Sequence, residues 1–252
     1  MDVRPLLTDV MTLTGDLVPR LQALRYDVTW KPDGSPVTQA DILMETELGD
    51  FLKSRLPGVR VIGEETFQDA DDQSPEGWIA VVDPIDGTEN FCSGLPEWGV
   101  ALTLWKDGAH AGSLLQLPEM GRHLMTGDTP PLLRSRIVGV SSTLKSETLG
   151  VLDTLIADGK AAQPPSDPEA RILGCAVYNL YNVARGALAR FVNPRGAYSW
   201  DLLAGVMLAL ENRCDVEIDG KPYDGHYLQA GRRHRVDIRH RYDLHPGQGP
   251  IG

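Results

Sequence analysis

The chain has 252 residues, 42% hydrophobic and 23% charged, so it can bury a large core as one domain or as two closely packed lobes. Its formal charge of −11 argues against a general nucleic-acid binder, and no apolar run is long enough to cross a bilayer, so we expect neither nucleic acid nor membrane as a partner. The start of the chain lacks the pattern of a secretion signal, and the three distant cysteines lack metal-binding spacing, so we expect reduced thiols and a cytoplasmic protein.

The first half of the chain contains two helical patterns followed by several strand patterns. Apolar residues at helical spacing predict a helix over 3–25, with Gly15 and Pro19 as weak points, and KPDGSP (31–36) predicts a turn. A second helix is expected within 37–58, where Pro57-Gly58 ends it. Apolar stretches between turn residues predict strands that continue as an antiparallel sheet, at 59–65, 77–83, 98–108, 111–118 and 122–127.

In the second half, strands and helices come in groups. We expect strands at 135–142 and 187–193 and helices at 146–159, 175–186 and 199–212, the last with Ser199 as its N-cap. From Gly231 on, arginines outnumber aspartates five to two, which predicts a surface strand and then a loose basic tail. This grouping favours an α+β or layered αβ architecture. We therefore expect one domain over 1–252, with an N-terminal half of about 1–130, a C-terminal half of about 135–230 and a tail at 231–252.

Negative charge is concentrated in one region. Residues 41–89 contain thirteen acidic residues and three basic ones, and part of this excess lies in QDADDQSPEG (68–77), which has the composition of a solvated turn. The rest surrounds VVDPIDGTENF (81–91). Clustered carboxylates repel one another unless they are solvated or share cations.

VVDPIDGTENF places Asp83 and Asp86 three residues apart at the end of an apolar strand. This spacing can aim both carboxylates into one pocket, and carboxylate oxygens suit Mg²⁺. Gly87 and Thr88 follow where a helix can begin, so their N–H groups can bind a phosphate and the hydroxyl can orient a water. An Asp turn that caps a helix explains the isolated motif equally well. A haloacid-dehalogenase-type phosphatase is disfavoured, because its nucleophilic Asp stands two residues before the second Asp, not three.

Three other acidic positions have simple structural explanations when each is taken alone. Glu64, with Glu65, resembles a solvated strand end, and Asp41 forms a capping pattern with Thr38. Asp201 follows Ser199 in the first turn of a helix, where the helix dipole favours an acid.

The order of these residues along the chain is more specific. Asp41, Glu64, Asp83-x-x-Asp86-Gly-Thr and Trp200-Asp201 together resemble the inositol monophosphatase family of Mg²⁺-dependent, lithium-sensitive phosphatases. The resemblance covers about two-thirds of the chain. It includes DGSPVTQAD, IGEE, WIAVVDPIDGTENF, GLPEWGVALTL, RILGCAVYNLYNVARG and WDLLAG.

This resemblance implies an αβαβα sandwich of mixed, mostly antiparallel sheets, with two or three Mg²⁺ ions between its halves. The first ion would be held by Glu64, Asp83 and the Ile85 carbonyl, and the second by Asp83, Asp86 and Asp201. Thr88 and Asp41 would orient and deprotonate an attacking water activated by the metal, while the Gly87 and Thr88 amides hold the phosphate of a small ester such as inositol 1-phosphate. Asp86 and Asp201 would also border the substrate. We further expect a homodimer.

The sequence departs from the family pattern at several places that do not touch the expected metal ligands. Asn193 and Arg195 stand where related enzymes place an acid for substrate hydroxyls, so we expect them to bind the leaving group. Cys175 replaces a common serine, and Glu211–Cys214 replaces E-A-G-G, which leaves the next strand open to displacement. Alternative substrates are histidinol phosphate, fructose 1,6-bisphosphate and 3′-phosphoadenosine phosphate. The alternative of another class is a catalytically silent metal-binding protein.

Overall fold

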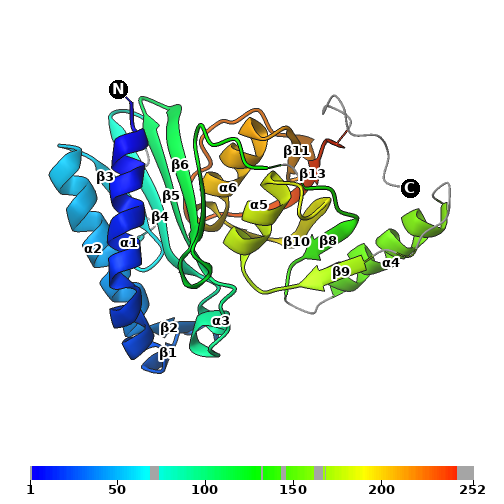
Figure 1. Cartoon of the computed structure of the whole chain (residues 1–252), viewed down its shortest axis with the longest axis horizontal. Coiled ribbons are helices and arrows are strands. Elements are labelled where there is room, and N and C mark those ends of the chain that lie inside the picture. Colours follow the sequence, from blue (N-terminus) through cyan, green and yellow to red (C-terminus); the bar gives the residue numbers. More distant parts are fainter. Residues whose placement is uncertain are drawn as a thin grey trace.

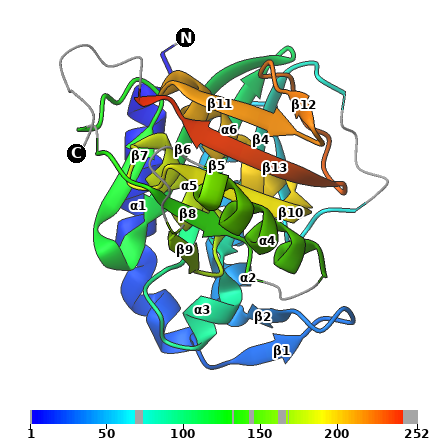
Figure 2. The same cartoon turned by 90° about the vertical axis from the view of Figure 1, so that its right-hand side faces the viewer.

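Five layers of helices and strands alternate across the molecule (Figures 1 and 2). The computed structural model describes residues 2–68, 74–131, 133–142, 146–161, 167 and 169–242. Residues 69–73 of the acidic turn expected at 68–77, and residues 243–252 of the expected tail, lie outside the described residues. Along the long axis the order is helices α1 and α2, a five-stranded sheet, helices α5 and α6, a six-stranded sheet, and helix α4. The αβαβα sandwich with mixed sheets is therefore confirmed.

The first two layers come from the N-terminal half. Helix α1 (Arg4–Leu24) is continuous through Pro19, and α2 (Gln39–Arg55) follows the short hairpin of β1 (Val28–Trp30) and β2 (Pro36–Thr38). The sheet has the order β3-β4-β5-β6-β7, parallel between β3 and β4 and antiparallel elsewhere. Its strands are β3 (Arg60–Gly63), β4 (Trp78–Asp86), β5 (Gly99–Lys106), β6 (Ala109–Leu117) and β7 (Arg122–Met125), with helix α3 (Thr88–Cys92) after β4 and a 3₁₀ turn, Pro118–Met120, after β6.

The remaining layers come from the C-terminal half. Helices α5 (Ala176–Ala184) and α6 (Ser199–Glu211) lie between the two sheets, and α4 (Ser146–Ala161) covers the outer face of the second. That sheet has the order β12-β11-β13-β10-β8-β9. Its strands are β8 (Ile137–Val140), β9 (Glu169–Ile172), β10 (Arg190–Tyr198), β11 (Cys214–Ile218), β12 (Lys221–Pro222) and β13 (Arg233–His240).

Strand β4 shows why the layers stack. Side chains of a strand point alternately to its two faces. Ile79 and Val81 belong to the core shared with α5 and α6, whereas Ala80 and Val82 belong to the core shared with α1 and α2. Both faces are apolar, so the sheet requires a helix layer on each side. The strand therefore lies deep in the molecule, and its last residues lie at the junction of both halves.

Three expected elements differ in the structure. The strand expected to end at Asn193 continues to Tyr198 as β10. Its pairing with β13 is interrupted between Asn193 and Ala197 and then resumes. The segment from Gly231, expected at the surface, forms β13, an inner strand whose apolar residues Val236 and Ile238 are buried between β10 and β11. Ser199 is not the N-cap of α6: Tyr198 occupies that position and its N–H donates to Asp201 Oδ2 (2.8 Å).

The segment that replaces E-A-G-G keeps the next strand in place. Arg213 adopts the left-handed conformation (φ 62°) that glycine favours, and β11 pairs with β13 directly afterwards, from Cys214 opposite His240. The turn is thus made without glycine, and the strand is not displaced from the sheet.

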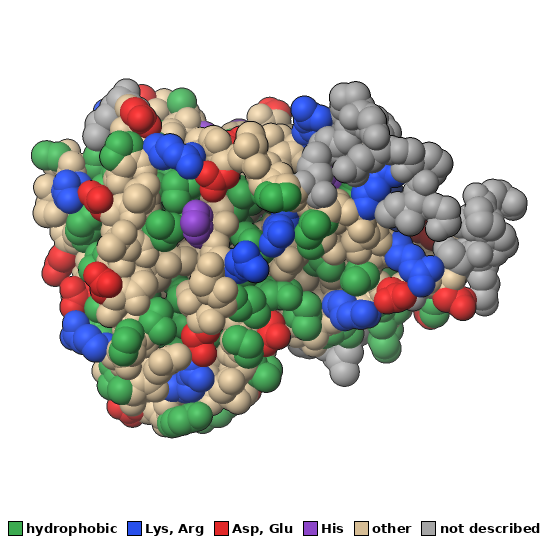
Figure 3. Space-filling view, in the orientation of Figure 1, with side chains coloured by type: hydrophobic (Ala, Val, Ile, Leu, Met, Phe, Trp, Pro, Cys, Tyr) green, Lys and Arg blue, Asp and Glu red, His purple; other side chains and the backbone are tan. Residues whose placement is uncertain are grey.

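The surface is mixed in charge. On the face shown in Figure 3, basic and acidic side chains are interspersed and separated by apolar and uncharged ones. None of the helices within the described residues is long and apolar enough to span a membrane.

Candidate metal centre

The end of strand β4 brings two carboxylates to one side. In a regular strand, residues three apart point to opposite faces. Asp83 pairs with Ala101 and Asp86 pairs with Gly99, so β4 has one residue more than β5 between these two pairs. The bulge reverses the alternation once and turns Asp83 and Asp86 toward the same space. This geometry explains the spacing of three residues in VVDPIDGTENF.

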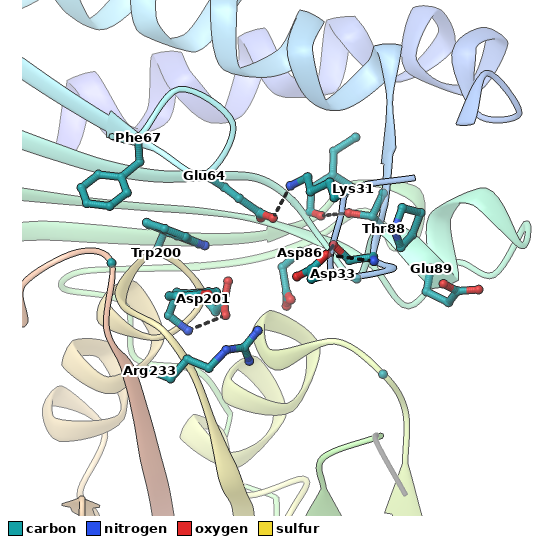
Figure 4. Close-up of a pocket in the computed structure, with 17 residues that line it drawn as sticks. Lys31, Asp33, Glu64, Phe67, Asp86, Thr88, Glu89, Trp200, Asp201 and Arg233 are labelled. Carbon is teal, nitrogen blue, oxygen red and sulfur yellow. Dashed lines mark hydrogen bonds and ion pairs between the residues drawn. The ribbon is translucent and has the colours of Figure 1, made fainter. Parts of the chain in front are cut away.

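Three carboxylates from separate elements converge beside this bulge. Glu64 follows β3, Asp83 lies near the end of β4, and Asp201 lies in the first turn of α6. Each offers an oxygen within 4.8 Å of the others (Figure 4 shows Glu64 and Asp201). Asp83 is fully buried; its Oδ1 accepts from the N–H of Ile85 (3.1 Å), while its Oδ2 has no hydrogen-bond partner among the described residues. A buried, unpartnered carboxylate oxygen among two further carboxylates fits a hard divalent cation.

Burial and neighbouring carboxylates raise the pKa of Asp83 and of Asp201. Burial, then the charges of Glu64, Asp86 and Asp201, raise the pKa of Asp83 well above its ordinary value. Burial and the charges of Asp86 and Glu64 likewise raise the pKa of Asp201. Since ionised carboxylates this close repel one another, the metal-free cluster is electrostatically unfavourable, and a cation would relieve it.

Asp86 is attached to the second helix layer. Its Oδ2 accepts from the Cys175 thiol (2.9 Å) and from the N–H of Val177 (2.5 Å), at the start of α5. Burial raises the pKa of Asp86 to about 6, although these two donors act in the opposite direction. Asp86 is outside the three-carboxylate cluster but borders the same cavity. It therefore joins the two halves of the molecule at the site.

Thr88 and Asp41, which we expected to orient and deprotonate a water, lie in contact. Thr88 Oγ1 is 3.1 Å from Asp41 Oδ1 and 3.0 Å from the Ile85 carbonyl oxygen. Asp41 Oδ2 also accepts from the N–H (2.8 Å) and hydroxyl (2.6 Å) of Thr38, which caps α2. The helix-capping explanation and the active-site explanation of Asp41 are thus compatible, because each uses a different oxygen.

Gly87 has a conformation and a position that few other residues could adopt. Its φ is +84°, in the left-handed region, and an added Cβ would lie 2.9 Å from the Cβ of Cys175. It directly precedes α3, so the backbone N–H groups of Gly87 and Thr88 lie at the beginning of that helix. Ile85 is buried, and its carbonyl oxygen is the acceptor near Thr88.

Lys31 is a site residue that the sequence reasoning missed. Its Nζ lies 3.0 Å from Glu64 Oε1 and 2.9 Å from Glu65 Oε1. Burial alone would lower the pKa of Lys31, but the two carboxylates outweigh it and raise that pKa. Lys31 is shared between two carboxylates, so its charge offsets the burial of Glu65 only in part. Burial therefore raises the pKa of Glu65 to about 7. The only sequence signal was a cation in the KPDGSP turn, beside the later acidic cluster.

Two connected cavities surround these groups. The larger, about 490 Å³, is lined by residues from the β1–β2 hairpin, the end of β4 and the start of α6. The smaller, about 200 Å³, contains Asn193 and Arg195, so the structure places both beside the centre, as expected. Arg233 lines both cavities, and it too was missed, because its segment had the composition of a surface strand.

Comparison with known proteins gives consistent matches. The family model described as "Inositol monophosphatase family" matches residues 19–225. A histidinol-phosphatase from Mycobacterium tuberculosis is 38% identical over 103 residues, which cover 41% of this chain and only 38% of that protein. An inositol-1-monophosphatase from Rhizobium meliloti is 26% identical over 226 residues, which cover 82% of each chain.

The fold also matches solved structures. One is titled an IMPase/NADP phosphatase complexed with Mg²⁺ and phosphate; it superimposes with a TM-score of 0.76 at 18% identity and covers 95% of this chain and 90% of that one. At this identity the match shows a shared fold.

Proposed function

This chain belongs to the inositol monophosphatase family, and we propose that it is a Mg²⁺-dependent phosphatase acting on a small polar phosphate monoester. The observation that supports this most directly is the meeting of Glu64, Asp83 and Asp201 next to the Thr88–Asp41 contact. Glu64, Thr88 and Asp201 line one cavity, Asp83 offers an oxygen within 4.8 Å of those of Glu64 and Asp201, and Asp41 accepts from Thr88.

The donor set fits Mg²⁺. Glu64, Asp83, Asp86, Asp201 and the Ile85 carbonyl would hold two or three ions, since all of them offer oxygen and Mg²⁺ prefers oxygen. When bound, Mg²⁺ supplies Lewis-acid polarisation of the phosphate and a lowered pKa for water.

Thr88 and Asp41 would prepare the nucleophile. The single hydroxyl proton of Thr88 has two acceptors, Asp41 Oδ1 and the Ile85 oxygen, so the lone pairs of Thr88 Oγ1 remain available to accept from a water. Asp41 is 1% exposed, and burial raises its pKa, which makes it a better base than an ordinary aspartate. The water would then attack phosphorus directly, without a covalent enzyme intermediate.

The phosphate would be held at the beginning of α3. There the N–H groups of Gly87 and Thr88 are available to an anion, as is usual at a helix N-terminus. Asp86 and Asp201 border this place and the smaller cavity, which would receive the leaving group.

Two substrate classes have support from relatives. Similarity to the Rhizobium inositol-1-monophosphatase supports an inositol phosphate as substrate, and similarity to the Mycobacterium histidinol-phosphatase supports histidinol phosphate. A catalytically silent metal-binding protein is the alternative of another class. Release of inorganic phosphate from a panel of esters, measured with Mg²⁺ and with excess chelator, tests the proposal. We expect Mg²⁺-dependent release and inhibition by lithium; activity that persists in chelator, or no release from any ester, would contradict it.

A further inference from the structure

The smaller cavity lies where the leaving group of a bound phosphate ester would extend. It has a volume of about 200 Å³ and is bordered by β10 and the beginning of β13. It shares with the larger cavity the residues Asp86, Gly174, Asp201 and Arg233. If the leaving group enters this cavity, the chemistry of its walls would determine which alcohol is accepted.

An irregularity in β10 aims Arg195 into this cavity. Asn193 pairs with Val236 and Ala197 with His234, so three residues of β10 lie opposite one residue of β13. Pro194 has no N–H for the sheet, and Gly196 (φ +79°) passes so close to β13 that an added Cβ would lie 3.0 Å from the His234 backbone. Arg195 lies between Pro194 and Gly196 and has no paired residue on β13. Its N–H donates instead to Asn193 Oδ1 (3.2 Å).

Arg233 approaches the same cavity from the neighbouring strand. It pairs with Tyr198 across the two strands, and its guanidinium lies over the Tyr198 ring, 4.4 Å from the centroid. Its Nη1 donates to the Gly196 carbonyl oxygen (3.2 Å). These contacts hold an otherwise exposed side chain in place, and Figure 4 shows it extending toward Asp86.

Arg195 and Arg233 differ from the other arginines of β10 and β13 in that they form no ion pair among the described residues. Within β10 and β13, Arg190 and Arg239 form ion pairs with Asp237, and Arg235 pairs with Asp219. No ion pair found in the described part of the chain involves Arg195 or Arg233. Two arginines without an ion-pair partner among the described residues therefore line the smaller cavity, and the guanidinium of Arg233 is held in place by its contacts with Tyr198 and Gly196.

We propose that Arg195 and Arg233 form an anion subsite, and that the substrate is a phosphate monoester whose leaving alcohol bears a second anionic group, a carboxylate or another phosphate. This inference rests on the proposed phosphatase function. Guanidinium groups bind carboxylates and phosphates through paired hydrogen bonds, which neutral hydroxyls match less well. A cationic alcohol such as histidinol would be repelled by the same two groups.

Matched ester pairs test this in the full-length protein with Mg²⁺. Fructose 1,6-bisphosphate against fructose 1-phosphate tests a second phosphate, and 3-phosphoglycerate against glycerol 3-phosphate tests a carboxylate. We expect kcat/KM to favour the anionic member of at least one pair by about tenfold or more, and histidinol phosphate to be poorer still. In Arg233→Gln and in Arg195→Gln that preference should fall by about threefold each, and in the double variant it should approach one.

Arg232→Gln is the control, because Arg232 adjoins Arg233, is exposed and lines neither cavity. The proposal is overturned if Arg232→Gln lowers the preference equally, if neither cavity variant changes it, or if both lose activity uniformly on every ester including p-nitrophenyl phosphate. If no ester is hydrolysed at all, the phosphatase function fails instead. Dissociation constants for the same pairs, measured with Ca²⁺, then decide the anion subsite separately: tighter binding of the anionic member, lost in Arg233→Gln, supports it, and equal binding overturns it.

Discussion

Asp83 combines complete burial, three acidic neighbours and an oxygen without a hydrogen-bond partner among the described residues. A protein retains such a group at a cost to its stability, because an ionised carboxylate in this environment is desolvated and repelled. A bound cation would offset this cost, because it would neutralise part of the negative charge around Asp83.

The variant Asp83→Asn therefore has two opposite expected effects. Metal binding and phosphatase activity should fall by at least about 100-fold, because a buried ligand loses its charge. The metal-free protein should become more stable at neutral pH, because the repulsion is removed. Calorimetric Mg²⁺ titration and thermal unfolding in chelator measure both effects.

The direction of the pH dependence follows from the raised pKa of Asp83. The folded metal-free protein binds a proton that the unfolded chain releases near pH 4, so stability in chelator should decrease as pH rises above about 4. Asp83→Asn should flatten this decrease. A variant that is less stable than the wild type at pH 7 in chelator would show that Asp83 is structural.

Thr88 offers a test of the chemical step alone. Thr88→Ala should leave Mg²⁺ binding nearly unchanged and lower kcat by about 100-fold or more, because the water loses its orienting hydroxyl. Thr88→Ser keeps the hydroxyl near Asp41 and should recover most of the activity. Equal losses in both variants, or a phosphorylated aspartate trapped during turnover, would contradict direct attack by an oriented water.

At the level of residues, the sequence predicted much of the site and missed specific contacts. Glu64, Asp83 and Asp201 lie close together, and Asp41 contacts Thr88, because each lies at or near an end of an element whose pattern was readable, whereas Asp86 lies outside the three-carboxylate cluster. Lys31 reaches the site through a hairpin pairing that no local pattern indicates.

At the level of elements, irregular strands shape the site. The bulge in β4 lets Asp83 and Asp86 point to the same side of the strand, and the irregularity in β10 frees Arg195 from the regular pairing with β13. The hydrophobic periodicity of one strand could not predict either irregularity, because a bulge exists only relative to the register of the strand that pairs with it. The position of β13 was also not predictable from its own residues. Its arginines suggested a surface strand, but β13 lies between β10 and β11, and Arg235 and Arg239 form ion pairs with Asp219 and Asp237.

The pair Arg190–Asp237 tests how β10 and β13 are held together. Two hydrogen bonds join them, at 2.8 and 2.5 Å. Burial alone would raise the pKa of Asp237, but hydrogen bonds from Arg190 and Arg239 lower it below its ordinary value. Partial exposure screens the pair, so Asp237→Asn should cost about 1 kcal/mol of unfolding free energy at pH 7.

This contribution depends on pH in a defined direction. Because the folded pKa is lowered, the stabilisation is present above the unfolded value of about 4 and is lost as pH falls further. Denaturant unfolding at pH 7 and pH 3 should therefore show a difference between wild type and Asp237→Asn only at pH 7. Asp215→Asn, which removes an exposed partner of Arg241 (3.5 Å), is the control and should cost less than about 0.5 kcal/mol. Equal costs in both variants would contradict this account.

For the whole molecule, the layer order was predictable and the strand order was not. The helix expected within 37–58 and that expected at 199–212 closely match α2 and α6, since continuous apolar patterns define them. The arrangement β12-β11-β13-β10-β8-β9 depends on pairings between segments distant in sequence.

The carboxylates of the candidate metal centre come from both halves, so Mg²⁺ bound there should stabilise the molecule as a whole. Glu64 follows β3, Asp83 lies in β4 and Asp201 lies in α6. At a Mg²⁺ concentration about 100 times the dissociation constant, binding should contribute about 2.7 kcal/mol, which raises the Tm by about 5–10 °C for a chain of this size. Thermal unfolding in Mg²⁺, in chelator and in NaCl of equal ionic strength measures this. The same rise in NaCl, or in Asp83→Asn, would exclude specific binding.

Helix α6 is buried between the two sheets, with Leu202, Leu203 and Val206 facing only other apolar groups. On the ribosome, the five-stranded sheet is complete some seventy residues before this helix emerges, and until α5 and then α6 follow, one apolar face lacks its helix layer. Asp201, the last carboxylate of the candidate metal centre, lies on the same helix. During synthesis, the apolar sheet face is therefore formed before the candidate metal centre can be complete.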